Sequence, residues 1–199
     1  IVATLGGREI HPINVRIGGF YRAPRREELA ALLPELVWAR GAAMELVDWV
    51  TGFSYPDVRN DYLFVSLRHP AEYPFNEGRV VSSAGLDIEP RDYDAHFSES
   101  HEQRSNALHT TQRGATMFCG PLARLALNFD RLPPLALEAA TRAGIDPSCR
   151  NPFKSLLARG VETVFALDEA IRVIEHYVYP ARSFVPPVWR AGTGFGATE

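Results

Sequence analysis

Histidines and glutamates gather between residues 96 and 109, in the stretch HFSESHEQRSNALH. The side chains concerned are those of His96, Glu99, His101, Glu102 and His109. Neutral imidazole and carboxylate groups both donate lone pairs to divalent cations, so this stretch could bind a metal. The HExxH spacing of zinc-binding helices is absent from it, and a solvated polar loop would have the same composition. Both interpretations stay open, and the loop is the simpler one.

A second group that could do chemistry is the glycine-rich run RAGTGFGATE at residues 190–199, with Gly192, Gly194 and Gly196. Glycine loops that bind dinucleotide phosphates have the spacing GxGxxG and lie between a strand and a helix. This run has the spacing GxGxG and follows a proline-rich extended segment, YPARSFVPPVW. The sequence therefore does not favour a nucleotide-binding loop here.

Arg159 and Glu162 lie one turn apart within a long predicted helix. That spacing favours an ion pair on the helix surface, which is worth about 0.2–0.5 kcal/mol. A buried pair that orients a neighbouring group is the sharper alternative. Gly160, between them, costs about 1 kcal/mol relative to alanine in a helix, but it permits close approach of another backbone.

The chain has two cysteines, Cys119 and Cys149, and neither belongs to a CxxC pair. Cys119 stands in the apolar context MFCGPLAR, which predicts a small buried side chain. Cys149 lies in the turn DPSCRNPF, and an ordinary loop cysteine is the simplest interpretation. Nothing in this spacing indicates the disulfide framework of a small secreted domain.

Hydrophobic periodicity predicts the elements that must position these residues. An alternation through Ile13, Val15 and Ile17 indicates a strand, and apolar spacing over residues 24–50 indicates a helix that Pro34 kinks or breaks. Further predicted elements are a buried strand at 61–69, a short strand within 76–88, a polar, loop-rich stretch from about 91 to 111, a helix at 132–144, and a helix at 152–177 capped by Asn151. The predicted fold class is mainly α with small β elements (α+β).

Composition excludes some classes of function. The 199 residues carry a net charge of −3 and are 46% hydrophobic, so no strong field draws the surface to nucleic acid or to an anionic membrane. No apolar run approaches the roughly 20 residues of a membrane-spanning helix, so we expect a soluble, cytoplasmic protein. The chain begins at Ile1 and not at Met, and both ends look like protein interior. We therefore expect residues 1–199 to be the central fragment of a single larger domain.

Six stretches of the chain, taken in order, resemble the large (alpha) subunit of nickel-iron hydrogenases. Within that family they look like the soluble cytoplasmic group linked to NAD(P), which includes the sulfhydrogenase-type alpha subunits. The stretches are GGREIHPINVRIGGFYRAP, YPFNEGRVVSSAGLDI, HEQRSNALHTTQ, GPLARLALNFDRLPPLALEAATRAGI, NPFKSLLARGVETVFALDEAIRVIE and RAGTGFGATE. Each is weak alone, whereas six in the family's order are a strong signal.

The resemblance implies a catalytic subunit that reversibly oxidises H2 to protons and electrons. In the family two cysteine pairs hold a nickel-iron centre. Neither pair is present here, and no second cysteine follows the DPSC at 146–149. We therefore expect this fragment to contribute no metal ligand, to bind no cofactor and to be inactive alone. The implied partners are H2, an iron-sulfur small subunit and diaphorase-type electron-transfer subunits with flavin and NAD(P), without nucleic acid or a membrane span.

The resemblance also selects candidate site residues. His11, Arg159 and Glu162 match positions of family motifs, and Glu199 would be the glutamate of a glycine-rich GATE segment. Such groups could orient metal ligands or relay protons, and the glycines before Glu199 would allow close backbone packing near a buried centre. For each of these residues we expect a structural role ahead of a functional one. The positions that depart from the family's pattern are Gly160, Arg104 and Cys119.

Two alternatives keep this fold and change the function. One is the quinone-site subunit of respiratory complex I with its energy-converting relatives, which resembles the family in architecture and lacks or varies the cysteine motifs. The other is a metal-free scaffold subunit of the same fold. The flanking sequence would discriminate among them, because only the hydrogenase needs the two cysteine pairs.

Overall fold

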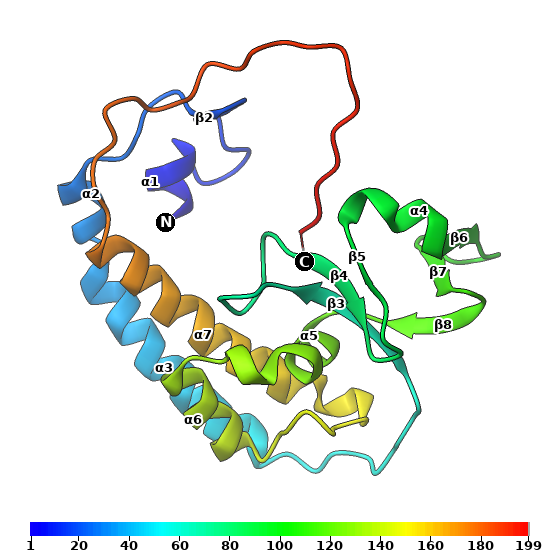
Figure 1. Cartoon of the computed structure of the whole chain (residues 1–199). Coiled ribbons are helices and arrows are strands. Elements are labelled where there is room, and N and C mark those ends of the chain that lie inside the picture. The colour runs from blue at the N-terminus through cyan, green and yellow to red at the C-terminus, as the bar shows by residue number, and fades with distance from the viewer. Residues whose placement is uncertain (199) are drawn as a thin grey trace. The chain divides into compact units, whose positions relative to one another are not determined.

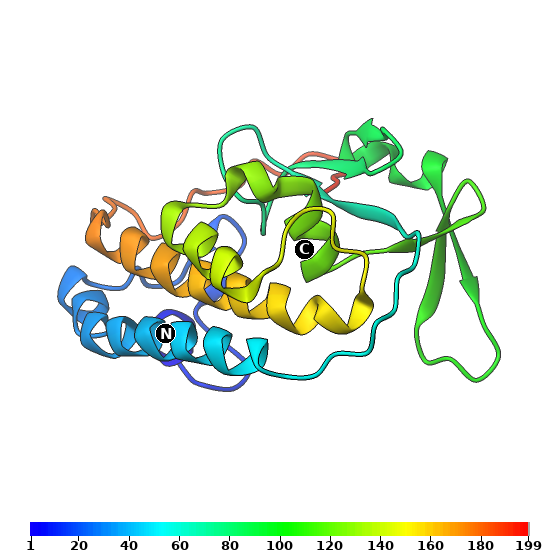
Figure 2. The same ribbon diagram turned by 90° about the horizontal axis from the view of Figure 1, so that it is seen from below.

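The computed structural model describes residues 1–198 and divides into two compact units (Figure 1). The first unit contains Ile1–Ala43 and Ala166–Thr193, and the second contains Met44–Phe165 with the residues from Gly194 onward. The boundaries fall inside the two long helices α3 (Leu33–Thr51) and α7 (Ser155–Glu175), which lie side by side in both views (Figures 1 and 2). Helices and a mixed sheet together make the chain α+β, as the sequence predicts.

Helix packing forms the core of the first unit. The first unit contains α1 (Val2–Gly6), α2 (Arg26–Ala30), the first part of α3 and the last part of α7. The buried side chains of Leu29, Leu36, Ile171 and Ile174 meet there, surrounded by partly buried leucines and Tyr177. The predicted break near Pro34 is confirmed, because α2 ends at Ala30 and α3 begins at Leu33. Proline is tolerated in a first helical turn, where its missing N–H has no partner to lose.

The predicted strand around residues 13–17 is only a two-residue ladder. Val15–Arg16 (β1) pairs with Gly19–Phe20 (β2), and the isoleucines at 13 and 17 are exposed. The hairpin gains a further partner from the extended segment after α7. There the backbone N–H of Phe20 donates to Ser183 O (2.9 Å), and that of Val185 donates to Gly18 O (2.9 Å). Backbone pairing, and not an apolar face, therefore holds this strand.

A six-stranded mixed sheet organises the second unit, in the order β5-β4-β3-β8-β7-β6. All neighbours are antiparallel except the parallel pair β3–β8. Its strands are β3 (Leu63–Arg68), β4 (Arg79–Ser82), β5 (Asp87–Ile88), β6 (Phe97–His101), β7 (Leu108–Gln112) and β8 (Ala115–Phe118). Val65, Leu67, Val80, Ile88 and Phe97 form a buried cluster on it. The predicted buried strand at 61–69 is confirmed as β3, and the strand within 76–88 as β4.

The prediction of a polar loop from about 91 to 111 is wrong. After the short helices η1 (Pro90–Asp92) and α4 (Tyr93–His96), the chain forms the hairpin β6–β7. A tight turn at Arg113 and Gly114, with φ values of 50° and 79°, then leads into β8. Two consecutive positive φ angles are typical of a type I′ hairpin turn. Such a strand is difficult to recognise in the sequence because its side chains are polar. Hydrogen bonds of the ladder satisfy its backbone, so the strand needs no buried apolar face.

Four helical segments complete the second unit: α5 (Pro121–Asn128), η2 (Phe129–Arg131), α6 (Pro134–Ala143) and η3 (Pro152–Lys154). The predicted helix at 132–144 is confirmed as α6, which ends at Gly144 in a left-handed conformation, φ 59°. The predicted cap is confirmed too, since the side-chain oxygen of Asn151 accepts a hydrogen bond from the Phe153 backbone N–H (3.0 Å). Among residues 1–198 no helix has the length and apolar character needed to span a bilayer.

Candidate functional site

Glu162 takes part in a buried ion pair, but its partner is Arg124 on α5 and not Arg159. Arg124 Nε donates to Glu162 Oε1 (2.6 Å), and Arg124 Nη2 donates to Oε2 (2.9 Å). The Tyr73 hydroxyl also donates to Oε1 (2.7 Å). Each of these three side chains is less than a tenth exposed. Three segments therefore meet at one carboxylate: helix α5, helix α7 and the loop between β3 and β4.

Aromatic rings enclose this constellation. The Arg124 guanidinium lies over the ring of Phe75, 4.7 Å from its centroid. The rings of Tyr73 and Phe75 each lie 5.1 Å from that of Phe165. Rings exclude water and lower the local dielectric, which strengthens the attraction between the paired charges. The same environment makes an unpaired charge costly, so the pair fixes the geometry of the elements that carry it.

Asn128 connects this centre to the sheet. Its side chain is fully buried on the last turn of α5. The Nδ2 group donates to Leu67 O (3.0 Å) and Arg124 O (3.0 Å) and contacts Ser66 Oγ (3.2 Å). Helix α5 is thus tied by buried polar contacts to β3 on one side and to α7 on the other.

Arg159 is exposed, and none of the ion pairs between described residues joins it to Glu162. The expected pair of Arg159 with Glu162 is therefore wrong, both as a surface pair and as a buried one; Glu162 is in a buried pair, but with Arg124. Arg159 is exposed, whereas Glu162 lies in a buried part of α7 with Ala158, Val161 and Phe165. The sequence did contain a signal for Arg124, a lone cation within the apolar run PLARLALN.

Close packing at Gly160 is confirmed. An added Cβ there would lie 3.1 Å from Val47 Cγ2 of α3. Within the second unit, the glycine therefore lets α7 approach the end of α3, and this close approach offsets its poor helix propensity.

The other candidates from the resemblance lie elsewhere. His11 is exposed in the first unit, has a positive φ of 52°, and accepts a hydrogen bond from Arg8 Nε at its carbonyl (2.6 Å). Arg159 and Glu162 belong to the second unit. Glu199 lies outside the described residues. At Gly192, Gly194 and Gly196 an added Cβ would meet nothing within 4 Å, so the expected close packing of these glycines is absent from the described part of the chain.

The histidine and glutamate stretch at 96–109 does not converge on a site. Ser100 pairs with His109 across the β6–β7 ladder, whereas Glu99 pairs with Thr110. Because side chains alternate between the faces of a strand, His109 lies on the opposite face from Glu99 and His101. The hairpin therefore separates the side chains that the sequence places together, and the metal interpretation is not supported there.

The cysteines do not fit a thiolate-bound nickel-iron centre. Both are free, Cys119 exposed and Cys149 partly buried. The expectation of a buried Cys119 is wrong, because Cys119 lies between the end of β8 and the first residue of α5, at the surface. The centre expected from the family needs four thiolates, and this chain has only two cysteines. No chemical step through such a centre can be derived from these residues.

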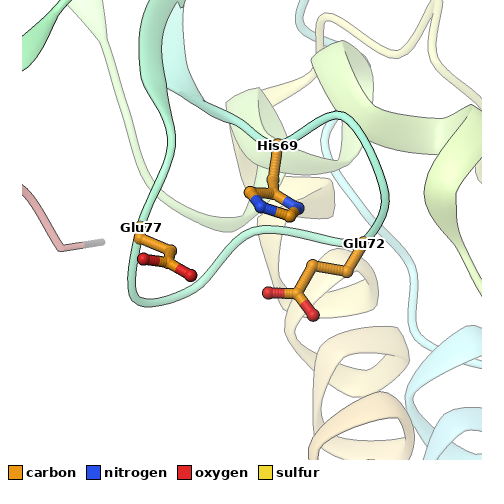
Figure 3. Close-up of side chains that lie close together, drawn as sticks. All are labelled: His69, Glu72 and Glu77. Carbon is orange, nitrogen blue, oxygen red and sulfur yellow. The ribbon is translucent and has the colours of Figure 1, made fainter.

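One group was missed by the sequence analysis. His69, Glu72 and Glu77 lie close together in the loop between β3 and β4 (Figure 3). They stand in RHPAEYPFNEGR, a stretch without a known metal-binding spacing. Only the folding of the loop brings them together.

Comparison with known proteins identifies relatives. No family model matches the chain. Sulfhydrogenase 1 subunit alpha of Pyrococcus furiosus is 27% identical over 200 residues, covering 98% of this chain and 46% of that subunit. Sulfhydrogenase 2 subunit alpha of the same organism is 25% identical over 178 residues, covering 86% of this chain and 39% of that subunit. The chain thus spans less than half the length of the curated relatives it matches.

A solved structure shows a similarity to hydrogenases in the fold as well. The crystal structure of NAD+-reducing NiFe hydrogenase in the H2-reduced state matches with a TM-score of 0.73 and 21% identity. The match covers 88% of this chain and 44% of that one. The resemblance found in the sequence and the α+β fold class are thereby confirmed. This chain is a relative of sulfhydrogenase alpha subunits, and it has the fold of part of a NiFe hydrogenase chain.

Proposed function

We propose that the chain is a central part of the catalytic subunit of a hydrogenase, within one large-subunit domain, and that the whole protein reversibly converts H2 to protons and electrons. The observation that carries the proposal is the similarity to a sulfhydrogenase alpha subunit along 98% of the chain. The six motif stretches and the fold match agree with it.

In this proposal the residues of the chain position other groups and do not themselves bind the nickel-iron centre. The Arg124–Glu162 pair, with Tyr73, holds α5, α7 and the β3–β4 loop in one arrangement. Groups that orient metal ligands need such rigid support, because small displacements change the geometry of a metal centre. His11, Arg159 and Glu199 remain proposed as orienting or proton-relaying groups. The thiolates of the centre would come from outside this chain.

The proposal extends to partners in the assembled enzyme. An iron-sulfur small subunit would take the electrons, and diaphorase-type subunits with flavin would pass them to NAD(P). The same proposal places the protein in the cytoplasm, where NAD(P) would be its electron acceptor. Alone, the 199-residue chain is expected to be inactive, since it lacks the thiolates that the centre requires.

Sequencing outward from this segment tests the proposal first. We expect a CxxC pair on the 5′ side and a second pair in a DPCxxC-like motif on the 3′ side. The complete protein, purified with its partner subunits, should then reduce a viologen dye with H2, and Cys→Ser variants of the pairs should not. An open reading frame without the cysteine pairs, together with no H2-dependent reduction, would overturn the proposal in favour of a complex I-like or scaffold subunit.

A further inference from the structure

We propose that His69, Glu72 and Glu77 form a binding site for a divalent transition-metal cation of the Zn2+ type. The site is independent of the thiolate-bound centre discussed above, and it departs from the expectation that the chain contributes no metal ligand. One ligand atom from each of the three residues lies within 4.8 Å of the other two. Figure 3 shows the imidazole and the two carboxylates grouped within one loop.

The backbone of the loop is held at both ends. Arg68 pairs with Arg79 at the end of the β3–β4 ladder, so His69 leaves one strand where Glu77 approaches the other. Gly78 has a φ of 150°, and an added Cβ there would lie 2.7 Å from Arg68 O. The lack of a side chain at Gly78 therefore allows the two ends of the loop to lie close together. The two outer ligands are therefore brought together by the sheet.

The middle of the loop is anchored by burial. Tyr73 is 3% exposed and donates to Glu162, and Pro74 is also fully buried. Glu72 immediately precedes these anchors, while its own carboxylate stays exposed. The buried residues that follow Glu72 therefore fix its backbone position near His69.

Charge also favours a cation at this position. The two arginines that flank the loop are engaged elsewhere: Arg68 with Asp130 (2.8 Å), and Arg79 with Asp87 (2.5 Å) and Glu89. Within residues 1–198, no ion pair includes Glu72 or Glu77. Two neighbouring carboxylates without a cation repel each other, and a bound divalent ion would relieve that repulsion.

The donor set selects the class of metal. One imidazole nitrogen and two carboxylate oxygens suit Zn2+ and similar first-row ions, whereas Mg2+ and Ca2+ prefer oxygen ligands alone. Zn2+ ligands at about 2.0–2.2 Å lie roughly 3.4 Å from one another in a tetrahedron. The exposed glutamate side chains must therefore close in slightly by changing rotamers. Three protein ligands leave the fourth position to water.

The imidazole must adopt one tautomer to bind. His69 Nδ1 accepts a long hydrogen bond from the Ala71 backbone N–H (3.3 Å), so the ring proton lies on Nε2 in this geometry. Binding of the neutral imidazole through Nε2 requires its proton on Nδ1, where it excludes the hydrogen bond from Ala71. The loss of one long contact is small beside the gain of three metal ligands.

The test uses the 199-residue chain with Cys119→Ser and Cys149→Ser, so that no thiol competes. Equilibrium dialysis against Zn2+, with metal analysis, should give one ion per chain. His69→Gln and the double variant Glu72→Gln/Glu77→Gln should each weaken binding at least tenfold. The matched control is His101→Gln/Glu102→Gln, an exposed imidazole and carboxylate on β6 and just after it, which should leave binding unchanged.

A second measurement needs no loop variant. Zn K-edge X-ray absorption of the same protein should show only nitrogen and oxygen ligands, with one imidazole. Absence of an equimolar ion overturns the proposal, and so does equal binding by the loop variants and the control. Equal affinity for Mg2+ overturns the assignment to a transition metal.

Discussion

At the scale of single residues, the partner of Glu162 decides what this carboxylate does. An exposed pair with Arg159 would have contributed a few tenths of a kcal/mol. The observed pair with Arg124 is buried, bidentate and shared with the Tyr73 hydroxyl. Removing one partner of such a pair is costly, because the remaining charge loses a close opposite charge in a water-poor environment.

The first prediction follows from that burial. Glu162→Gln should lower the free energy of unfolding by about 3–5 kcal/mol, because the buried Arg124 guanidinium loses the bidentate ion pair with this carboxylate. Urea unfolding followed by circular dichroism measures the change. Arg159→Ala, one turn away and exposed, is the matched control and should stay within about 0.5 kcal/mol of the parent. Similar effects of the two variants would contradict the assignment of Arg124 as the partner.

The second prediction concerns pH. The hydrogen bond from Arg68 holds the pKa of Asp130 below its usual value of 3.8. Because the folded-state pKa is depressed, this contribution to stability is present above the unfolded-state pKa and is lost as the pH falls through the folded-state pKa. The side chain is 55% exposed, so solvent screening limits the contribution to below about 1 kcal/mol.

Between pH 5 and pH 2, the free energy of unfolding of Asp130→Asn should therefore fall by less than that of the parent. The difference should stay below about 1 kcal/mol. Unfolding by urea at a series of pH values measures the difference, and other carboxylates cancel in the comparison. Asp94→Asn changes an exposed aspartate for which no ion pair is described among residues 1–198, and it serves as the control. An Asp130→Asn curve parallel to that of the parent would contradict the role of Arg68.

At the scale of elements, glycines decide where backbones can meet. Gly18 has a φ of 86°, and an added Cβ would lie 2.1 Å from Val185 O. The segment 183–185 pairs with the β1–β2 hairpin through that gap. Gly41, in contrast, lies exposed within α3 with nothing near an added Cβ.

The third prediction compares these two glycines. Gly18→Ala should destabilise the first unit by about 1–3 kcal/mol, through backbone strain and loss of the contact with residue 185. It should also increase protease cleavage between residues 180 and 190. Gly41→Ala should instead stabilise the protein by about 0.5–1 kcal/mol, because alanine favours a helix interior. Thermal unfolding and limited proteolysis measure both changes, and a neutral Gly18→Ala variant would argue against the docking of this segment.

At the scale of the whole molecule, large apolar side chains remain at the surface. Trp38 is 73% exposed and Trp49 is 65% exposed, and their 11-residue spacing places them on one face of α3. Trp189 is 76% exposed in the extended segment after α7. Exposed apolar groups of this size are typical of surfaces that meet another protein segment or a partner.

The fourth prediction is that the isolated chain self-associates. Sedimentation at increasing concentration should show species larger than the monomer, and Trp38→Glu/Trp49→Glu should shift the population toward monomer. The control Gln103→Glu/Asn106→Glu adds the same charge at exposed positions between β6 and β7 and should change association much less. A monodisperse monomer of the parent chain at all concentrations would count against this prediction.

Local signals in the sequence determined the helices at 132–144 and 152–177, the break near Pro34 and the buried strand at 61–69. Periodicity and capping residues act within a few positions of one another, so they can be recognised without the fold. The motif order likewise determined the relationship to hydrogenase alpha subunits.

Only the tertiary structure decided that polar residues 97–112 form a hairpin, because strand pairing can satisfy the hydrogen bonds of a backbone whatever its side chains are. It alone placed Arg124 against Glu162, 38 residues away, and gathered His69, Glu72 and Glu77 in one loop. Such contacts join residues whose spacing carries no periodic signal, since chain folding and not local propensity sets their distance.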